Sequence, residues 1–289
     1  MFRHNNRNHS ARFEMDMTTG ALLPKVLMFS LPLIASGILQ LLFNAADMVV
    51  VGRFAGKQYL AAVGSTGSLI NLMVNVFIGL SVGGSVAVAK SFGAGDPAAV
   101  HKAVHTAMSL AVIAGVVVGL IGFIFCRPLL KLMDNPVLDL ATTYMKIYFL
   151  GMPFNMIYNF GASILRAVGD TKRPLIYLTI AGVVNVVLNL ITVVLLHMNV
   201  AGVAIATVAS QAVSAVLVVA CLMRSHGVVH LDLKELRIYK RQLKDIARVG
   251  LPAGLQGSLF SISNVLIQSS INSFGEVVVA ANSAGGNLE

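Results

Sequence analysis

Residues 103–126 read AVHTAMSLAVIAGVVVGLIGFIFC, a run without aspartate, glutamate, lysine or arginine. As an α-helix, it is long enough to cross the roughly 30 Å hydrocarbon core of a bilayer at 1.5 Å per residue. Hydrocarbon offers no water to unpaired backbone groups, so an apolar run of this length must be helical there. The run is too long for a strand and lacks strict alternation, and it predicts a membrane-spanning helix.

Similar apolar segments recur along the 289-residue chain, in which 56% of the residues are hydrophobic and only 11% are charged. A soluble globular domain carries about 25% charged residues. We therefore expect an all-α, polytopic membrane protein. The predicted segments are 25–51, 61–89, 103–126, 138–165, 174–197, 201–223 and 249–271, and a further one begins near Ala280.

The positive charges alternate between the two ends of these segments. Sixteen of the 21 lysines and arginines lie in the N-terminal tail and in loops 90–102, 166–173 and 224–248, whereas the alternate loops contain four. Because positively charged loops stay in the cytoplasm, we expect a cytoplasmic N-terminus and a multi-pass protein of the plasma (inner) membrane. The formal net charge of +9 then reflects topology, and we expect no nucleic-acid partner.

The sequence divides into four parts. Residues 1–24 form a polar tail without the apolar region of a signal peptide. Six predicted helices fill 25–223, the basic stretch 224–248 is a cytoplasmic linker, and 249–289 begins a second lobe. An internal repeat supports this division, because many transporters consist of two duplicated lobes with a site at their interface.

The repeat appears when the sequence is shifted by 220 residues. The shift places Asn44 on Asn264 and Phe54 on Phe274 without a gap. The matches are few, but they extend over a pair of predicted segments, so we expect the seventh segment to start a second copy of the first lobe.

Polar side chains inside the apolar segments follow narrow stripes. Gln40, Asn44 and Asp47 are spaced i, i+4 and i+7, which places them on one face of a helix. Such amides can hydrogen-bond packed helices to one another, or they can line a shared polar cavity. We favour the cavity because a bundle needs far fewer such bonds. The other stripe residues are Ser68, Asn71, Asn75, Asn155, Asn159, Asn185, Asn189, Thr192, Thr207, Gln211, Ser214, Ser261, Asn264 and Gln268.

Asp47 is the one acidic residue that we place inside an apolar segment. A charged aspartate at the centre of a membrane costs about 2.5–3.5 kcal/mol on insertion scales. A lone buried carboxylate exchanges a proton or binds a cation. We therefore expect Asp47 to act on a coupling ion, and a purely structural hydrogen bond is the alternative.

Small residues and prolines mark places of close packing. Gly79 and Gly83 form a pair spaced by four, as do Gly115 and Gly119, and such pairs let membrane helices approach closely. Pro153 lies within the fourth segment, where it can kink the helix. A hinge and a simple packing feature are both consistent with it.

The remaining candidates for chemistry are few. His101 and His105 are spaced i, i+4, but zinc needs a third ligand and the sequence offers none nearby, so we expect no metal site. The sequence has no phosphate-binding glycine loop, HExxH motif or nucleophile elbow, so we expect neither an enzyme nor an organic cofactor. Cys126 and Cys221 lie at segment ends predicted to face opposite sides, so no disulfide is expected.

Several stretches, taken in order, resemble the multidrug and toxic compound extrusion (MATE) family of efflux transporters. QLLFNAAD at 40–47 followed by VGR at 51–53 resembles the first helix of that family, and AAVG at 61–64 resembles its second. RAVGDTK at 166–172 is similar to the loop after its fourth helix, and ATVASQ at 206–211 to its sixth.

The resemblance implies an antiporter with two six-helix lobes that exports cationic, amphipathic drugs or metabolites in exchange for H⁺ or Na⁺ by alternating access. It implies that Asp47 is the cation-site carboxylate, with Asn185, Asn189 and Thr207 beside it. The family often has an aspartate at the position of Asn189, so the choice between H⁺ and Na⁺ stays open. The expected substrate-cavity residues are Gln40, Asn44, Asn71, Asn75, Asn155, Asn159, Gln211, Asn264 and Gln268.

Two other functions remain in consideration. A lipid-linked oligosaccharide flippase of the same superfamily would need a cationic cavity, whereas the stripes contain no lysine or arginine. A truncated, non-transporting half-protein would fit a sequence that stops within its eighth segment. The expected partners are cationic small molecules and the lipid bilayer, and the sequence gives no oligomeric state.

Overall fold

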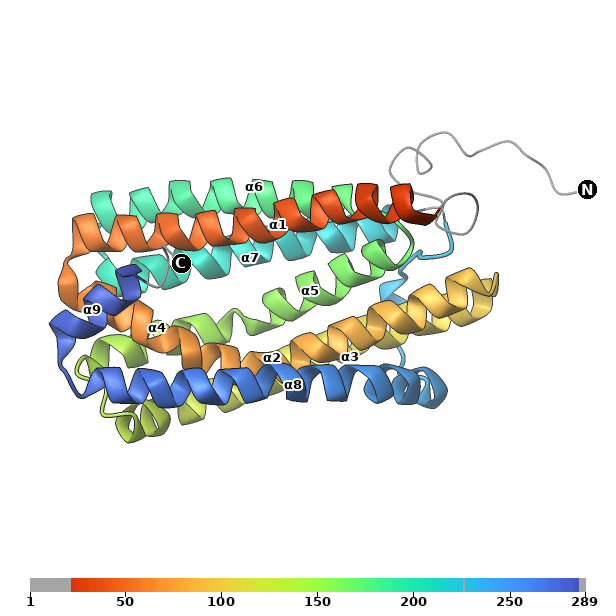
Figure 1. The fold of residues 1–289 in the computed structure, drawn as a ribbon. Coiled ribbons are helices and arrows are strands. Elements are labelled where there is room, and N and C mark those ends of the chain that lie inside the picture. The colour runs from red at the N-terminus through yellow and green to blue at the C-terminus, as the bar shows by residue number, and fades with distance from the viewer. Residues whose placement is uncertain (1–21, 226, 286–289) are drawn as a thin grey trace, which may run out of the picture.

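A computed structural model describes residues 22–225 and 227–285, and these residues form helices and no strand (Figure 1). The predicted all-α fold is confirmed, while most of the predicted polar tail lies outside the described residues. The α-helices are α1 (Leu22–Val50), α2 (Lys57–Gly93), α3 (Pro97–Leu132), α4 (Leu138–Leu150), α5 (Met152–Ala167), α6 (Lys172–Asn189), α7 (Asn199–Arg224), α8 (Lys240–Asn272) and α9 (Glu276–Gly285).

Five stretches of the described chain are long and apolar enough to cross a membrane. They confirm that this is a multi-pass membrane protein, although α4, α5 and α8, which cover two of the predicted segments, are not among them. The five candidate spans are Leu23–Ala55, Lys57–Gly93, Pro97–Leu132, Lys172–Leu195 and Asn199–Arg224.

The predicted fourth segment, 138–165, is two helices instead of one. α4 ends at Leu150, and the N–H of Gly151 donates to the carbonyl of Tyr148 at 3.0 Å, which closes the last turn. α5 restarts at Met152 with Pro153 in its first turn, where the missing N–H of a proline costs no hydrogen bond. Hydropathy follows composition alone, and therefore did not show this break.

The predicted start of the seventh segment is also wrong. α8 begins at Lys240 and not at residue 249, so the last third of the predicted linker is helical. The residues 240–248 carry Lys240, Arg241, Lys244 and Arg248, and hydropathy registers only the apolar part of such a helix. α9 likewise begins before Ala280, at Glu276.

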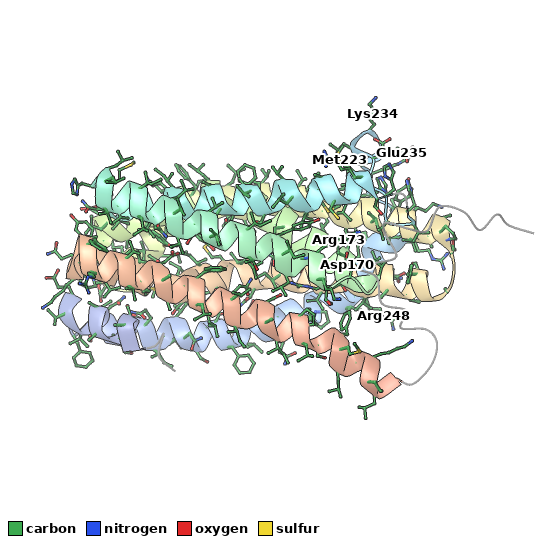
Figure 2. All side chains as sticks on the ribbon, turned by 90° about the horizontal axis from the view of Figure 1, so that it is seen from above. Asp170, Arg173, Met223, Lys234, Glu235 and Arg248 are labelled. Atoms are coloured by element: carbon green, nitrogen blue, oxygen red, sulfur yellow. The ribbon has the colours of Figure 1, made fainter. Side chains whose placement is uncertain are left out.

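The helices pack in two groups joined by α5 and α4. α1 lies along α6, and α6 packs on α7, whereas α2, α3 and α8 lie together on the other side of the bundle (Figure 1). The start of α1, the turns α2–α3 and α5–α6, and the stretch between α7 and α8 all lie at one end. Figure 2 places Arg173, Lys234 and Arg248 toward this same end. We call it the basic end, because the three predicted basic loops 90–102, 166–173 and 224–248 all lie there, beside the start of α1.

Asp170 fixes the start of α6 at the basic end. Its side chain is almost fully buried, and one carboxylate oxygen accepts the N–H of Arg173 at 3.1 Å. The other oxygen lies 3.3 Å from Nε of the same arginine. Burial raises the pKa of Asp170, because desolvation of the carboxylate outweighs the opposing effects of Arg173 and Lys172. The contacts between Asp170 and Arg173 therefore order the turn at which α6 begins.

The tightest helix pair is α2 with α8. A Cβ added at Gly79 would lie 2.2 Å from the backbone nitrogen of Gly254, and one at Gly83 would lie 2.2 Å from the carbonyl oxygen of Ile246. The two backbones touch along this line, which only glycine permits. Asn75 donates to Ser261 Oγ at 2.7 Å and continues the same seam.

The second glycine pair packs α3 against the break between α4 and α5. A Cβ at Gly115 would lie 2.5 Å from Pro153 Cα, and one at Gly119 would lie 2.8 Å from the carbonyl oxygen of Phe149. The break is therefore held by direct backbone contact.

Cys126 of α3 and Cys221 of α7 are both free thiols, as predicted.

We expect Gly79→Ala to lower the stability of the protein by about 1–3 kcal/mol, because the added methyl must force α2 away from α8. The measurement is thermal unfolding in detergent. Gly67→Ala on the same helix is the matched control, since a Cβ there would have no atom within 4 Å. Equal melting temperatures for the two variants would contradict the description of the seam.

Candidate functional site

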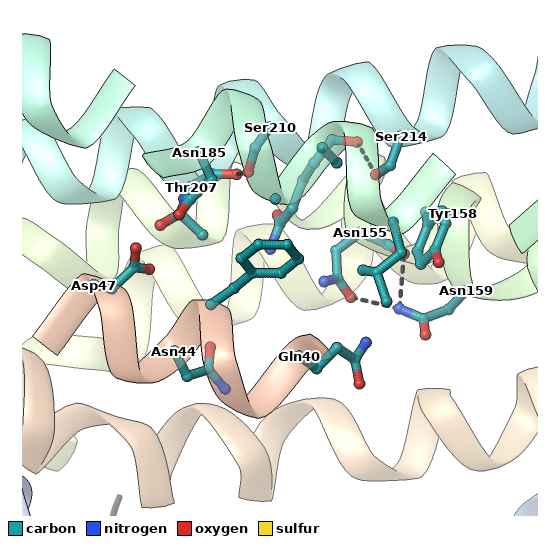
Figure 3. Close-up of a pocket in the computed structure, with 15 residues that line it drawn as sticks. Gln40, Asn44, Asp47, Asn155, Tyr158, Asn159, Asn185, Thr207, Ser210 and Ser214 are labelled. Carbon is teal, nitrogen blue, oxygen red and sulfur yellow. Dashed lines mark hydrogen bonds between the residues drawn. The ribbon is translucent and has the colours of Figure 1, made fainter. Parts of the chain in front are cut away.

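A polar cavity opens between α1, α2, α5, α6 and α7, and Figure 3 shows its residues pointing toward one another. It consists of two adjoining hollows of about 150 Å³ and about 590 Å³. Both hollows are lined by Gln40, Asn44, Asp47, Asn155, Thr207 and Gln211.

Most of the predicted polar stripes face this cavity. The stripe Gln40, Asn44, Asp47 of α1 lies along one wall, opposite Asn155 of α5 and Thr207 of α7 (Figure 3). Of the other predicted residues, those that line one or both hollows are Ser68, Asn71, Asn159, Asn185, Gln211 and Ser214.

Three predicted cavity residues lie elsewhere. Asn75 is in the seam between α2 and α8, where it also donates to the carbonyl of Gly257 at 3.3 Å. Asn264 is exposed on α8. Gln268 is buried and donates to Asn272 at 3.0 Å. Asn75 therefore hydrogen-bonds between two helices, and Gln268 hydrogen-bonds within its own helix.

Asp47 is hydrogen-bonded across the bundle to α6. The side-chain N–H₂ of Asn189 donates to Asp47 Oδ1 and, at 3.2 Å, to Asn185 Oδ1. Asn189 is 1% exposed, and its own Oδ1 is buried without a hydrogen-bond partner in the described part of the chain. An orphaned acceptor beside a carboxylate is unusual, because a buried polar atom normally finds a partner.

Thr207 completes the group from α7. Its hydroxyl donates to the carbonyl of Val203 on its own helix at 2.9 Å, which leaves the oxygen able to accept. Asp47, Asn185, Asn189 and Thr207 thus offer oxygen atoms from three helices. Neither hollow has a lysine or arginine in its described lining. A cation or a proton is the partner that such a set favours.

Both helices that carry this group change their winding directly after it. α1 passes into a π-helical turn at Val51–Ala55 soon after Asp47, and α6 does so at Leu190–Leu195 directly after Asn189. π-helical turns are rare and occur frequently at functional sites. Hydropathy did not predict these turns, because they depend on local hydrogen bonding.

Several lining residues were not predicted. Tyr144 and Tyr148 of α4 and Asn282 and Ser283 of α9 line the larger hollow. The two tyrosines are one helical turn apart in an apolar stretch, and that spacing was the available signal. The α9 residues lie at the end of the described chain, where the predicted eighth segment was too short to show a stripe.

Comparison with known proteins identifies the family. The MatE family model matches residues 32–191, which is more than half of the chain and includes Asp47, Asn185 and Asn189. The chain belongs to the MatE family. The predicted resemblance is confirmed, and with it the MATE-like helical fold.

Named relatives match over much of this MATE chain. It is 28% identical over 276 residues to the probable multidrug resistance protein YpnP of Bacillus subtilis, covering 95% of this chain and 62% of that protein. It also resembles the inward-facing structure of a multidrug resistance MATE family transporter of the MOP superfamily, with a TM-score of 0.79 and 29% identity. That match covers 86% of this chain and 57% of the other.

A further solved structure, the outward-facing conformation of a multidrug resistance MATE family transporter of the MOP superfamily, matches with a TM-score of 0.78 and 27% identity. The match covers 91% of this chain and 64% of the other. The chain thus spans about three-fifths of the length of the relatives that it matches.

A double-mutant cycle tests the contact between α1 and α6. We expect Asp47→Ala and Asn189→Ala to show a coupling of about 1–3 kcal/mol in the free energy of unfolding, because each removes the partner of the other. The measurement is denaturant unfolding in detergent of both single variants and the double variant.

The control cycle combines Asp47→Ala with Thr179→Val, whose hydroxyl bonds to Leu175 of its own helix. These two changes should add. A coupling between Asp47 and Asn189 no larger than that of the control pair would contradict the observed hydrogen bond.

Proposed function

We propose that this MATE chain serves as a secondary active antiporter that exports cationic, amphipathic drugs or metabolites in exchange for H⁺ or Na⁺. The observation that carries the proposal is the position of Asp47. Its carboxylate lies in a polar cavity lined by uncharged side chains, next to the buried, unpartnered Oδ1 of Asn189. A cationic substrate and a coupling cation can both be attracted to this one negative group.

The proposed mechanism is alternating access driven by competition at Asp47. When H⁺ or Na⁺ binds there, the charge that holds a cationic substrate is neutralised and the substrate is released. The flanking π-helical turns give α1 and α6 a place to change their winding. Relatives of similar fold are known in an inward-facing and an outward-facing conformation, which supports such a cycle.

The proposed arrangement in the cell follows the charge pattern. The basic end faces the cytoplasm of a plasma (inner) membrane protein, with the N-terminus inside. Residues 25–223 form the first lobe, the stretch around 224–248 links it to the second, and α8 and α9 belong to that second lobe. In this division, the contacts of α8 and α9 with α2 are contacts between the two lobes.

The flippase alternative is less well supported. A pyrophosphate-linked substrate calls for lysines or arginines in the cavity, and the described lining has none. A non-transporting half-protein remains an outcome that the efflux experiment can give.

We expect purified chain in proteoliposomes to drive ethidium efflux when a H⁺ or Na⁺ gradient is imposed. Asp47→Asn should reduce the gradient-driven rate at least about tenfold, because the amide cannot bind either cation as a carboxylate does. Asp139→Asn is the control, since its carboxylate is largely exposed and pairs with Arg127 at 3.0 Å.

Two outcomes oppose the proposal. Undiminished efflux by Asp47→Asn would remove Asp47 from the coupling step. No efflux by the unmodified chain under either gradient would favour the non-transporting alternative.

A further inference from the structure

A second polar cluster lies at the basic end, away from the cavity. His101 and His105 stand one helical turn apart at the start of α3, with ring centroids 4.0 Å apart. Glu235, from the short 3₁₀ helix Leu233–Glu235 between α7 and α8, brings its Oε2 to 3.0 Å from His101 Nε2. Figure 2 shows Glu235 projecting at this end. One ligand atom from each of the three residues lies within 4.8 Å of the others.

The hydrogen bonds of His105 determine which of its nitrogens has a lone pair. Nε2 accepts the backbone N–H of Asp232 at 3.1 Å, and because a backbone N–H can only donate, Nε2 carries no proton. Nδ1 therefore carries the proton and donates to the carbonyl of His101 at 2.8 Å. Metal-binding histidines show this same arrangement, in which one nitrogen donates to a backbone carbonyl and the other faces the ion.

The segment that carries Glu235 is held against the bundle by other contacts. The N–H of Leu231 donates to the carbonyl of Leu222 at 3.1 Å, and the Leu231 side chain is buried. The N–H of Tyr239 donates to Thr106 Oγ1 at 3.2 Å, next to His105 on α3. The segment is thus anchored on both sides of Glu235, which keeps its carboxylate near the two histidines and lowers the entropic cost of bringing the three ligands together.

We propose that His101, His105 and Glu235 bind a divalent ion of the zinc class, which ties the segment between α7 and α8 to α3. Two imidazole nitrogens and one carboxylate oxygen are a recognised zinc ligand set, with a fourth position left for water. The ion takes the place of the proton between His101 and Glu235 and displaces the Asp232 N–H from His105. The ion enters past the side chains of His101 and Glu235, which are 37% and 58% exposed, and reaches His105, which is buried behind them.

The site differs from the cavity in both place and chemistry. Zinc bonds of about 2.0–2.1 Å place tetrahedral ligand atoms roughly 3.3 Å apart. The three ligand atoms now lie within 4.8 Å of one another. A small movement of the turn that carries Glu235 brings them to the zinc spacing, and this turn is free to move because the side chains of Leu233 and Lys234 are exposed. The expected absence of a metal site rested on the lack of a third ligand near the histidines. Glu235, 130 residues further along the chain, supplies one.

Zinc binding to the full chain in detergent tests this proposal. The protein carries no polyhistidine tag, and His4 and His9 of the tail are replaced by asparagine so that they do not bind the ion. Competition against a chromophoric chelator should give one Zn²⁺ per chain. His101→Ala and Glu235→Gln should each weaken binding at least about tenfold, since even the loss of an outer partner of a zinc ligand has an effect of that size.

The Glu235→Gln variant separates a metal ligand from a simple hydrogen-bond partner. The glutamine side chain can still accept a hydrogen bond from the N–H of His101. If the contact is purely structural, the melting temperature of Glu235→Gln, measured without metal, should therefore equal that of the parent protein. His197→Ala, a histidine between α6 and α7, is the control and should bind like the parent protein.

Co²⁺ bound in place of Zn²⁺ should show the strong visible absorption of a four-coordinate ion, and that absorption should be absent in His101→Ala. No stoichiometric Zn²⁺ binding, or binding that Glu235→Gln leaves unchanged, would overturn the proposal.

Discussion

Hydrocarbon cannot hydrogen-bond, and this constraint governs the positions of polar groups in the protein. A polar side chain in a membrane helix must find a partner within the protein or face a water-filled cavity. Asp47 carries the largest such demand, and Asn189 of α6 meets part of it across the bundle. The contact joins α1 to α6, which lies more than 120 residues later in the sequence. The polar stripes of α1, α2, α5, α6 and α7 then enclose one cavity around that charge.

The sequence predicted much of this site, because two of its signals are physically direct. The absence of charge over 20 residues and more requires helices, and the spacing of Gln40, Asn44 and Asp47 requires one common face. The spacing does not predict which helix or cavity that face contacts. Asn71 and Asn75 are spaced i, i+4 on α2, yet Asn71 lines the cavity while Asn75 bonds to α8.

Helix ends and long-range pairs were harder to predict for related reasons. Lys240 and Arg241 are polar, so hydropathy hid the first turns of α8. The break at Gly151 depends on backbone contact between α3 and Pro153, which no local pattern contains. The meeting of His105 with the Asp232 N–H joins residues 127 positions apart. Only the folded chain places them together.

α8 and the segment that leads to it are held against α2 and α3 in two different ways. Along the α2–α8 seam, Gly79 and Gly254 allow the backbones to touch, and this contact resists separation through packing alone. At the basic end, Leu231, Tyr239 and the His101–Glu235 pair hold the connecting segment to the bundle through hydrogen bonds and charge. A cycle of alternating access would have to preserve the seam or replace it, whereas the connecting segment can move with α3.

The central claim is that Asp47 couples a cation to a cationic substrate, and thermodynamic linkage tests it without requiring transport. Ethidium binding to the purified chain, followed by fluorescence at several Na⁺ concentrations and pH values, measures that coupling directly. The account predicts that raising Na⁺ or H⁺ weakens ethidium binding to the parent protein. In Asp47→Asn this dependence should vanish. An equal dependence on Na⁺ and pH in the two proteins would contradict the account.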